Sequence, residues 1–367
     1  MDIQSVLPNI LYGYHGLAPH AKYFNVKFNV DLITGTGGIS LLLCAFPYGQ
    51  ELPIKVVSLV LFFLNLVLFS VFTVWAITRY YWYPEDWMEL MNHPTLSLFL
   101  GCFPMSFTTI LNVSIDVIYG YFGFGGKGFL YSIWIMWWIN VAVSSAYGWG
   151  MMHHMYVKVS LHQVVSGLDG NYCAHRITGQ THSLEQMSTI WLLPVVTLVV
   201  SSSTAGVLAN ALREYSIMHA LVTLTAGVFI VTVGFALSFI IFTIYFQRLF
   251  VYGLPEGAEA LTSFLPLGPS GTAGFSIILI GQNFNKIFPS ITSASMFLGW
   301  PYAGQAINVL CTCIAFLLWA LASMFLFFGL LSIITMVRRT HIQFTPSFWG
   351  LIFPNVSLPY IECKISF

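Results

Sequence analysis

The chain has 367 residues, of which 57% are hydrophobic and only 7% are charged, and its basic and acidic residues balance to a net charge of zero. A soluble domain carries about 25% charged residues, so this composition excludes an ordinary soluble protein. The balanced charge also argues against a nucleic-acid partner. The sequence therefore predicts an all-α integral membrane protein that lies in a lipid bilayer.

Nine stretches are candidate membrane spans, because about 20 apolar residues cross the hydrocarbon core of a bilayer. They cover residues 26–46, 54–78, 95–119, 129–152, 188–211, 217–246, 264–282, 301–337 and 347–360. The first, seventh and ninth are the weakest, since they contain charges or several glycines and prolines. Together they predict that residues 1–367 form a single transmembrane transport domain.

The longest polar segment lies between the fourth and fifth spans, at residues 153–187, and it contains five histidines (His153, His154, His162, His175 and His182). These histidines do not have the spacing of a metal-binding helix. We therefore expect a solvated loop, with neither a metal ion nor a cofactor.

Positive charges indicate how the chain is oriented, because cytoplasmic segments retain lysine and arginine. With the N-terminus inside, the inner segments hold eight basic residues: Lys22, Lys27, Arg79, Lys158, Arg176, Arg248, Arg338 and Arg339. The outer loops hold four: Lys55, Lys127, Arg213 and Lys286. This asymmetry predicts a cytoplasmic N-terminus.

The odd-numbered spans share prolines, glycines and hydroxyl side chains, whereas the even-numbered spans are plainer. Proline inside a helix removes a backbone hydrogen bond and kinks the rod, and glycine permits close packing or a break. We predict an inner ring of kinked helices that lines a path for substrate, surrounded by an outer ring that faces lipid. The residues expected on this path are Gly35, Thr36, Gly37, Ser40, Pro104, Ser106, Thr109, Pro194, Ser201, Ser202, Pro266, Gly268, Pro269, Gly271, Phe353 and Pro354.

Two carboxylates fall within candidate spans, Asp31 and Asp116. An ionisable group at membrane depth is costly and marks a candidate functional residue, here for proton coupling. The alternatives are that Asp116 ends the third span near an interface and that Asp31 pairs with Lys27, one helical turn earlier. No cation is placed securely in the middle of a span, so an anionic cargo would be held by dipoles and hydroxyl groups.

Several motifs occur in order along the odd-numbered spans. They are Gly35-Thr36-Gly37-Gly38-Ile39-Ser40, His93-Pro94 followed by Phe103-Pro104-Met105, Trp191-Leu192-Leu193-Pro194, Pro266-Leu267-Gly268-Pro269 and Phe348-Trp349-Gly350-Leu351-Ile352-Phe353-Pro354. In these motifs the chain resembles the tellurite-resistance/dicarboxylate transporter family, which includes the plant slow anion channels, and within it the fungal sulfite efflux pumps.

The resemblance implies a ring of helical hairpins whose odd-numbered helices line a central pore. It also implies that Phe353 is a gate which obstructs this pore, and that the protein assembles as a homotrimer. Soon after Phe353-Pro354 the sequence turns polar, so the last helix of the family pattern is expected to be truncated or missing.

These features favour the export of a small anion, sulfite or hydrogen sulfite, across the plasma membrane. A C4-dicarboxylate (malate) permease and a truncated variant without transport activity are the alternatives. An enzyme is not expected, because the spans contain no paired carboxylates or nucleophile with a base. The sequence leaves open whether the protein is a channel or a proton-coupled carrier.

Overall fold

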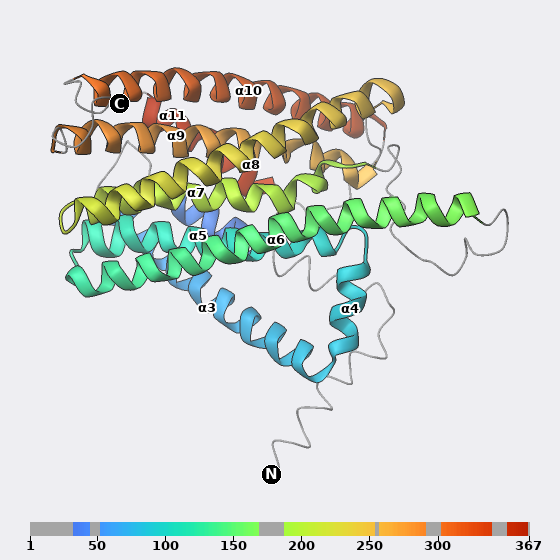
Figure 1. Ribbon diagram of the computed structural model, residues 1–367, viewed down its shortest axis with the longest axis horizontal. Coiled ribbons are helices and arrows are strands. Elements are labelled where there is room, and N and C mark those ends of the chain that lie inside the picture. Colours follow the sequence, from blue (N-terminus) through green and yellow to red (C-terminus); the bar gives the residue numbers. More distant parts are fainter. Residues whose placement is uncertain are drawn as a thin grey trace, which may run out of the picture.

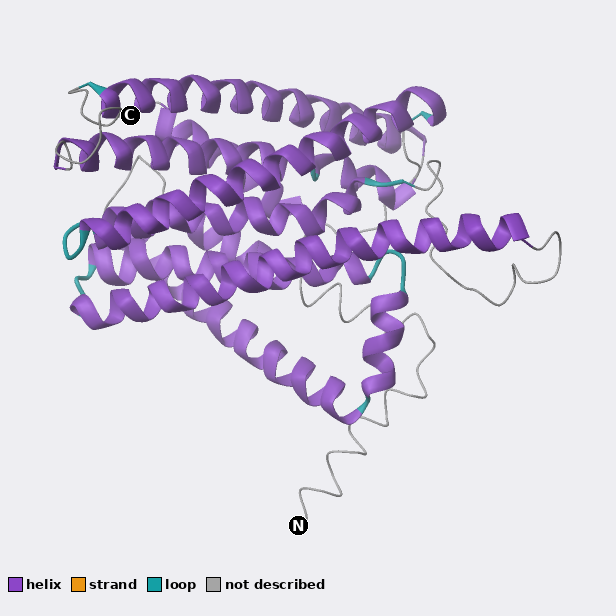
Figure 2. Cartoon of the chain, viewed as in Figure 1, coloured by secondary structure: helices purple, strands orange, loops and turns teal. Residues whose placement is uncertain are grey.

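The computed structural model describes residues 32–44, 52–168, 187–253, 257–290, 302–339 and 351–365. Every regular element within these ranges is a helix (Figure 2). Seven helical segments there are long and apolar enough to cross a membrane: Leu52–Trp82, Ser97–Tyr121, Gly126–Met155, Thr189–Leu212, Ile217–Tyr252, Leu261–Ile287 and Ala303–Thr335. The predicted all-α membrane fold is confirmed.

Four long helices form the outer layer: α3 (Leu52–Trp82), α6 (Gly126–Leu168), α8 (Ile217–Tyr252) and α10 (Ala303–Arg339). Only 22–39% of their most apolar windows is buried within the protein, and their exposed side chains are largely apolar. Such a surface is stable against lipid, where helices satisfy their own backbone groups. Figure 1 shows α3 leaning away from the bundle where it meets the short helix α4 (Pro84–Asn92).

The inner layer consists of the spans that carry the prolines. The windows at Ser97–Tyr121, Thr189–Leu212 and Leu261–Ile287 are 83%, 94% and 89% buried. Their central helix is α7 (Leu193–Leu212), which packs against α5 (Cys102–Val113), α6, α8 and α9 (Leu267–Ile287) (Figure 1). The predicted alternation of inner and outer spans is present in the described part of the chain.

The inner spans change helix type instead of kinking. A 3₁₀ segment precedes each α-helix: η1 (Ser97–Gly101) before α5, η3 (Thr189–Leu192) before α7 and η4 (Gly257–Phe264) before α9. Pro104, Pro194 and Pro269 lie in the first turns of these α-helices, where a missing N–H costs little. The predicted mid-helix kinks at these prolines are therefore wrong. The other end of α5 continues into a π-helical segment, η2 (Ser114–Tyr121).

Two of the three weakest predicted spans, the first and the ninth, contain the helices Leu32–Cys44 and α11 (Ile352–Ile365). Pro359 lies inside α11, which extends five residues beyond the predicted end of the ninth span at 360. The loop predicted at 153–187 also begins too early, because α6 continues to Leu168. Residues 169–186 of that loop lie outside the described residues.

Polar side chains join α6 to the inner helices. Asn140 donates from Nδ2 to Thr108 Oγ1 at 2.9 Å and to Ser201 Oγ at 3.3 Å. The indole of Trp137 donates to the carbonyl of Ser201 at 3.0 Å. Because water is absent from the bilayer core, such bonds must satisfy these groups within the protein, and they fix the orientation of α7 relative to α6.

We predict that Gly271→Ala destabilises the contact between α9 and α11. A Cβ atom at this position would lie 2.5 Å from Ser357 Oγ and 2.9 Å from the carbonyl carbon of Ser357, so the helices would have to separate. The expected loss is about 1–3 kcal/mol of unfolding free energy, measured by thermal unfolding in detergent. The matched control is Gly150→Ala on α6, where a Cβ meets nothing within 4 Å and the helix should gain slightly. Equal melting temperatures for both variants would contradict the prediction.

Candidate functional site

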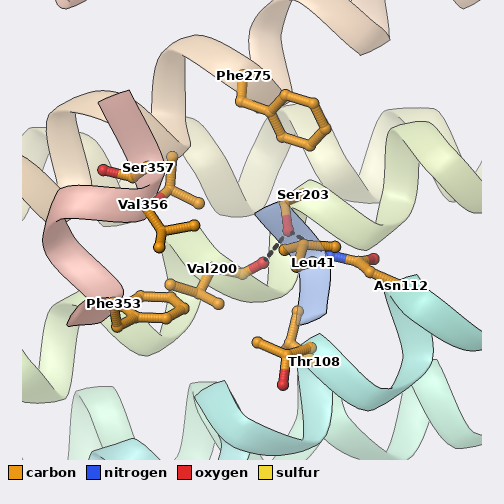
Figure 3. A pocket seen from close by; sticks show the side chains of 11 residues that line it. Leu41, Thr108, Asn112, Val200, Ser203, Phe275, Phe353, Val356 and Ser357 are labelled. Atoms are coloured by element: carbon orange, nitrogen blue, oxygen red, sulfur yellow. Dashed lines mark hydrogen bonds between the residues drawn. The ribbon is translucent and has the colours of Figure 1, made fainter. Parts of the chain in front are cut away.

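A small cavity lies among the inner helices, about halfway along them. Its volume is about 30 Å³, enough for a water-sized guest. We call it the central cavity. It is lined by residues from the helix Leu32–Cys44, α5, α7, α9 and α11: Leu41, Thr108, Thr109, Asn112, Val200, Ser203, Thr272, Phe275, Phe353, Val356 and Ser357 (Figure 3).

A larger cavity of about 430 Å³, the vestibule, lies where α3 begins and where α7 and α9 end. Unlike the central cavity, it contains charged residues of both signs on its walls. Its lining residues are Cys44, Lys55, Ile115, Asp116, Tyr119, Gly120, Gly206, Val207, Asn210, Ala211, Glu214, Phe275, Leu279, Gln282, Asn283 and Lys286.

The two cavities follow one another along the same helix faces. On α7, Ser203 lines the central cavity, and Gly206 and Val207 line the vestibule three and four residues later. Residues at this spacing share one face of a helix. Phe275 on α9 is the one described residue that lines both cavities, and it is only 1% exposed. Phe275 therefore lies at the boundary between the two cavities.

The hydroxyl groups around the central cavity are bonded to the backbone of their own helices. Thr109 Oγ1 donates to the Ser106 carbonyl at 2.7 Å, and Thr272 Oγ1 donates to the Gly268 carbonyl at 2.6 Å. In helices these back-bonds go to carbonyls that also accept backbone N–H groups, so a hydroxyl can turn toward a guest at small cost. The central cavity can offer several weak donors, and its described lining contains no charged side chain.

Asn112 differs from these hydroxyl residues. Its Nδ2 donates to Ser203 Oγ at 3.2 Å (Figure 3), whereas its Oδ1 is buried and has no hydrogen-bond partner within the described structure. A buried acceptor without a donor costs about 1–3 kcal/mol. A guest that carries a proton could supply the missing donor.

Two of the residues predicted from the sequence, Thr109 and Phe353, line the central cavity. Phe353 is half-buried at the start of α11. Figure 3 shows its ring at one edge of the group of lining side chains and the ring of Phe275 at another. Asp116 lies on the vestibule wall, half-buried in η2. Asp31 lies outside the described residues.

The other predicted hydroxyl residues lie at helix contacts and line neither cavity. Thr36 bonds back to Leu32, and Ser40 bonds to the Ser58 carbonyl on α3. In contrast to Ser203, Ser201 faces α6 and Ser202 bonds to Ser276 on α9. Ser106 contacts Thr34 at 2.6 Å. These five residues line neither of the two described cavities, so their lining role stays a prediction.

The predicted glycines and prolines support the path without lining it. A Cβ at Gly37 would overlap Thr109 Oγ1, so this glycine allows the helices to approach closely. A Cβ at Gly268 would lie 3.8 Å from the Cα of Pro354, an ordinary van der Waals contact. The remaining residues of this kind are buried and line neither cavity: Gly35, Pro104, Pro194, Pro266, Pro269, Gly271 and Pro354.

Sequence reasoning missed Asn112, Ser203, Thr272 and Phe275. A signal exists for three of them, because Asn112, Ser203 and Phe275 each lie three residues after another lining residue, namely Thr109, Val200 and Thr272. The spacing cannot choose a face by itself, since the run Ser201-Ser202-Ser203 presents hydroxyl groups over most of the circumference of α7.

Comparison with known proteins agrees with this architecture. Residues 31–361 match the voltage-dependent anion channel family, SLAC1. The chain belongs to this family. The sulfite efflux pump SSU1 of Trichophyton rubrum is 32% identical, over 91% of this chain and 78% of that protein. The malic acid transport protein of Schizosaccharomyces pombe is 23% identical, over 90% of this chain and 67% of that protein.

Membership of an anion channel family confirms the resemblance seen in the sequence. It makes this chain a multi-pass membrane protein of anion transport, and it implies that the chain is not an enzyme.

We predict that Asn112→Leu lowers anion flux without destabilising the fold. The substitution removes a buried acceptor that has no partner in the described structure, so the melting temperature should stay constant or rise. Loss of a polar contact to a charged guest should reduce flux into liposomes about tenfold.

The matched control for Asn112→Leu is Asn140→Leu, since Asn140 is a buried, hydrogen-bonded asparagine that lines neither cavity. It should lose about 1 kcal/mol of stability and keep its flux per folded molecule. The reverse pattern in the two variants would contradict a substrate role for Asn112.

Proposed function

We propose that this protein exports sulfite or hydrogen sulfite across the plasma membrane, with residues 1–367 acting as one transmembrane transport domain. The observation that carries the proposal is the narrow central cavity, placed in series with the vestibule along the buried inner helices. Similarity to sulfite efflux pumps supports the choice of substrate.

The size and polarity of the central cavity favour a small oxyanion. A volume of about 30 Å³ holds a water-sized guest, so a small oxyanion requires less widening of this cavity than a larger acid does, and the lining offers hydroxyl and amide dipoles without a fixed charge. Weak binding of this kind allows an anion to leave as readily as it enters. Hydrogen sulfite retains a proton, which could be donated to Asn112 Oδ1.

A malate permease is the second candidate, because a malic acid transport protein is among the relatives. The vestibule, at about 430 Å³, has room for a C4 dicarboxylate and carries Lys55 and Lys286 on its walls. The central cavity would have to widen considerably to pass such a substrate, which favours the smaller anion.

The proposed orientation places the N-terminus in the cytoplasm. Lys55, Lys127, Arg213 and Lys286 lie near helix ends on the vestibule side, which the distribution of basic residues makes the outer side. The vestibule would then be the exit of the path. Asp116 on its wall is the proposed site of any proton coupling, and a homotrimer is the proposed assembly.

The substrate is tested in yeast cells that lack their own sulfite pump. Cells expressing the chain should retain less sulfite than cells with an empty vector after equal loading, and their malate content should be unchanged. Equal sulfite retention in both strains would refute sulfite export, and lowered malate alone would establish the dicarboxylate function instead.

We predict that Phe353 and Phe275 act as two barriers in series. Removal of one ring leaves the other in place, so Phe353→Ala or Phe275→Ala should raise anion conductance only about twofold when the barriers are similar. The double variant should increase conductance by far more than the product of the single effects.

The control for these two rings is Phe325→Ala. Phe325 on α10 is about as buried as Phe275, at 2% exposure, but it packs against Phe242 and Phe246 of α8 and lines neither cavity. It should leave the conductance of reconstituted protein unchanged. Simple multiplicative effects of the two path residues would contradict barriers in series.

A further inference from the structure

Lys55 is a buried cation that the transport path described so far does not use. It lies in the first turn of α3, is 7% exposed and lines the vestibule. Its Nζ donates to the carbonyl of Cys44 at 2.7 Å and lies 5.9 Å from the centre of the Tyr121 ring. The ammonium is therefore held at the end of the helix Leu32–Cys44, on the wall of the cavity.

The Lys55 ammonium uses only part of its hydrogen-bonding capacity within the described structure. An ammonium has three N–H donors, and the described structure provides one acceptor, the Cys44 carbonyl, and no carboxylate in ion-pair contact with Lys55. A buried charge is costly unless it is paired or hydrogen-bonded. The remaining donors can be satisfied by whatever occupies the vestibule.

The helix ends around the vestibule favour a cation there. α7 and α9 both direct their C-terminal ends to this cavity, at Leu212 and Ile287. Each such end carries roughly half a negative charge, which repels anions. Lys55 offsets this potential beside the cavity, and Lys286 adds a second ammonium on the α9 wall.

We propose that the vestibule contains an anion-binding site centred on the Lys55 ammonium, which holds a small oxyanion next to the Phe275 ring. This inference rests on the proposed function, since it assigns the place where the transported anion binds outside the narrow central cavity. Asp116 and Glu214 line the same vestibule, so the net formal charge of its walls is low. The site therefore binds an anion locally and does not trap it.

The test uses the full-length protein in lipid nanodiscs, titrated with sodium sulfite at constant ionic strength while thermal unfolding is followed. Saturable stabilisation is expected, since a ligand that binds the folded state raises its stability. Lys55→Met, which keeps the length of the side chain, should raise the half-saturating sulfite concentration at least about tenfold, because a charge-assisted contact is lost. Lys55→Arg should retain binding.

Two further variants separate an effect on the site from a general effect on the fold. Lys127→Met is the matched control. Lys127 is an exposed lysine near the same ends of the helices, but its ammonium lies over the Tyr131 ring and does not line the vestibule. It should bind sulfite as the wild-type protein does. Asp116→Asn removes a negative charge from the vestibule wall and should tighten binding, an effect that misfolding cannot produce.

Flux of sulfite into liposomes is measured on the same samples, so that the two proposals can fail separately. Wild-type flux without saturable sulfite binding, or unchanged binding in Lys55→Met, would overturn the vestibule site and leave sulfite transport standing. Binding that depends on Lys55 without sulfite flux would support the site and refute the proposed transport function.

Discussion

Within the hydrocarbon core of a bilayer no water is present to satisfy polar groups, and the inner helices of this protein are organised by that constraint. Their hydroxyl side chains bond to carbonyls one turn earlier or to a neighbouring helix, as Thr109 does to Ser106 and Ser202 does to Ser276. Small residues such as Gly37 and Gly271 then let the helices approach closely. The result is a buried inner layer that is polar inside and needs no solvent.

The proposed path for an anion passes the places where buried polar groups have unused hydrogen-bonding capacity in the described structure. Asn112 Oδ1 has no partner in the described structure, and Lys55 has one acceptor for its donors there. These two residues lie on different cavities, and the ring of Phe275 lies between the cavities. In the proposed direction of export, a substrate would therefore exchange a site that contains only dipoles for one with a fixed charge. This exchange limits the strength of binding at each step and so permits passage.

The change from 3₁₀ to α-helix at the start of the inner spans gives the prolines a different role from the predicted one. Pro104, Pro194 and Pro269 lie in the first turns of α-helices, where they do not interrupt the hydrogen bonds of the helix. The continuous helix α7 keeps Val200, Ser203, Gly206, Val207 and Asn210 on one face, so that a single helix lines both cavities. The continuity of the path depends on this regularity.

The sequence by itself determined the fold class, the alternation of inner and outer spans and the family, because apolar length, proline positions and ordered motifs are local properties of the chain. It also indicated Thr109 and Phe353. It could not choose among Ser201, Ser202 and Ser203, which differ by about 100° of rotation around α7, nor separate the lining Asn112 from the structural Asn140. It treated Lys55 as a loop charge, although the lysine is buried beside Cys44. Only the tertiary structure decided these roles, because the neighbours that each helix face meets come from distant parts of the chain.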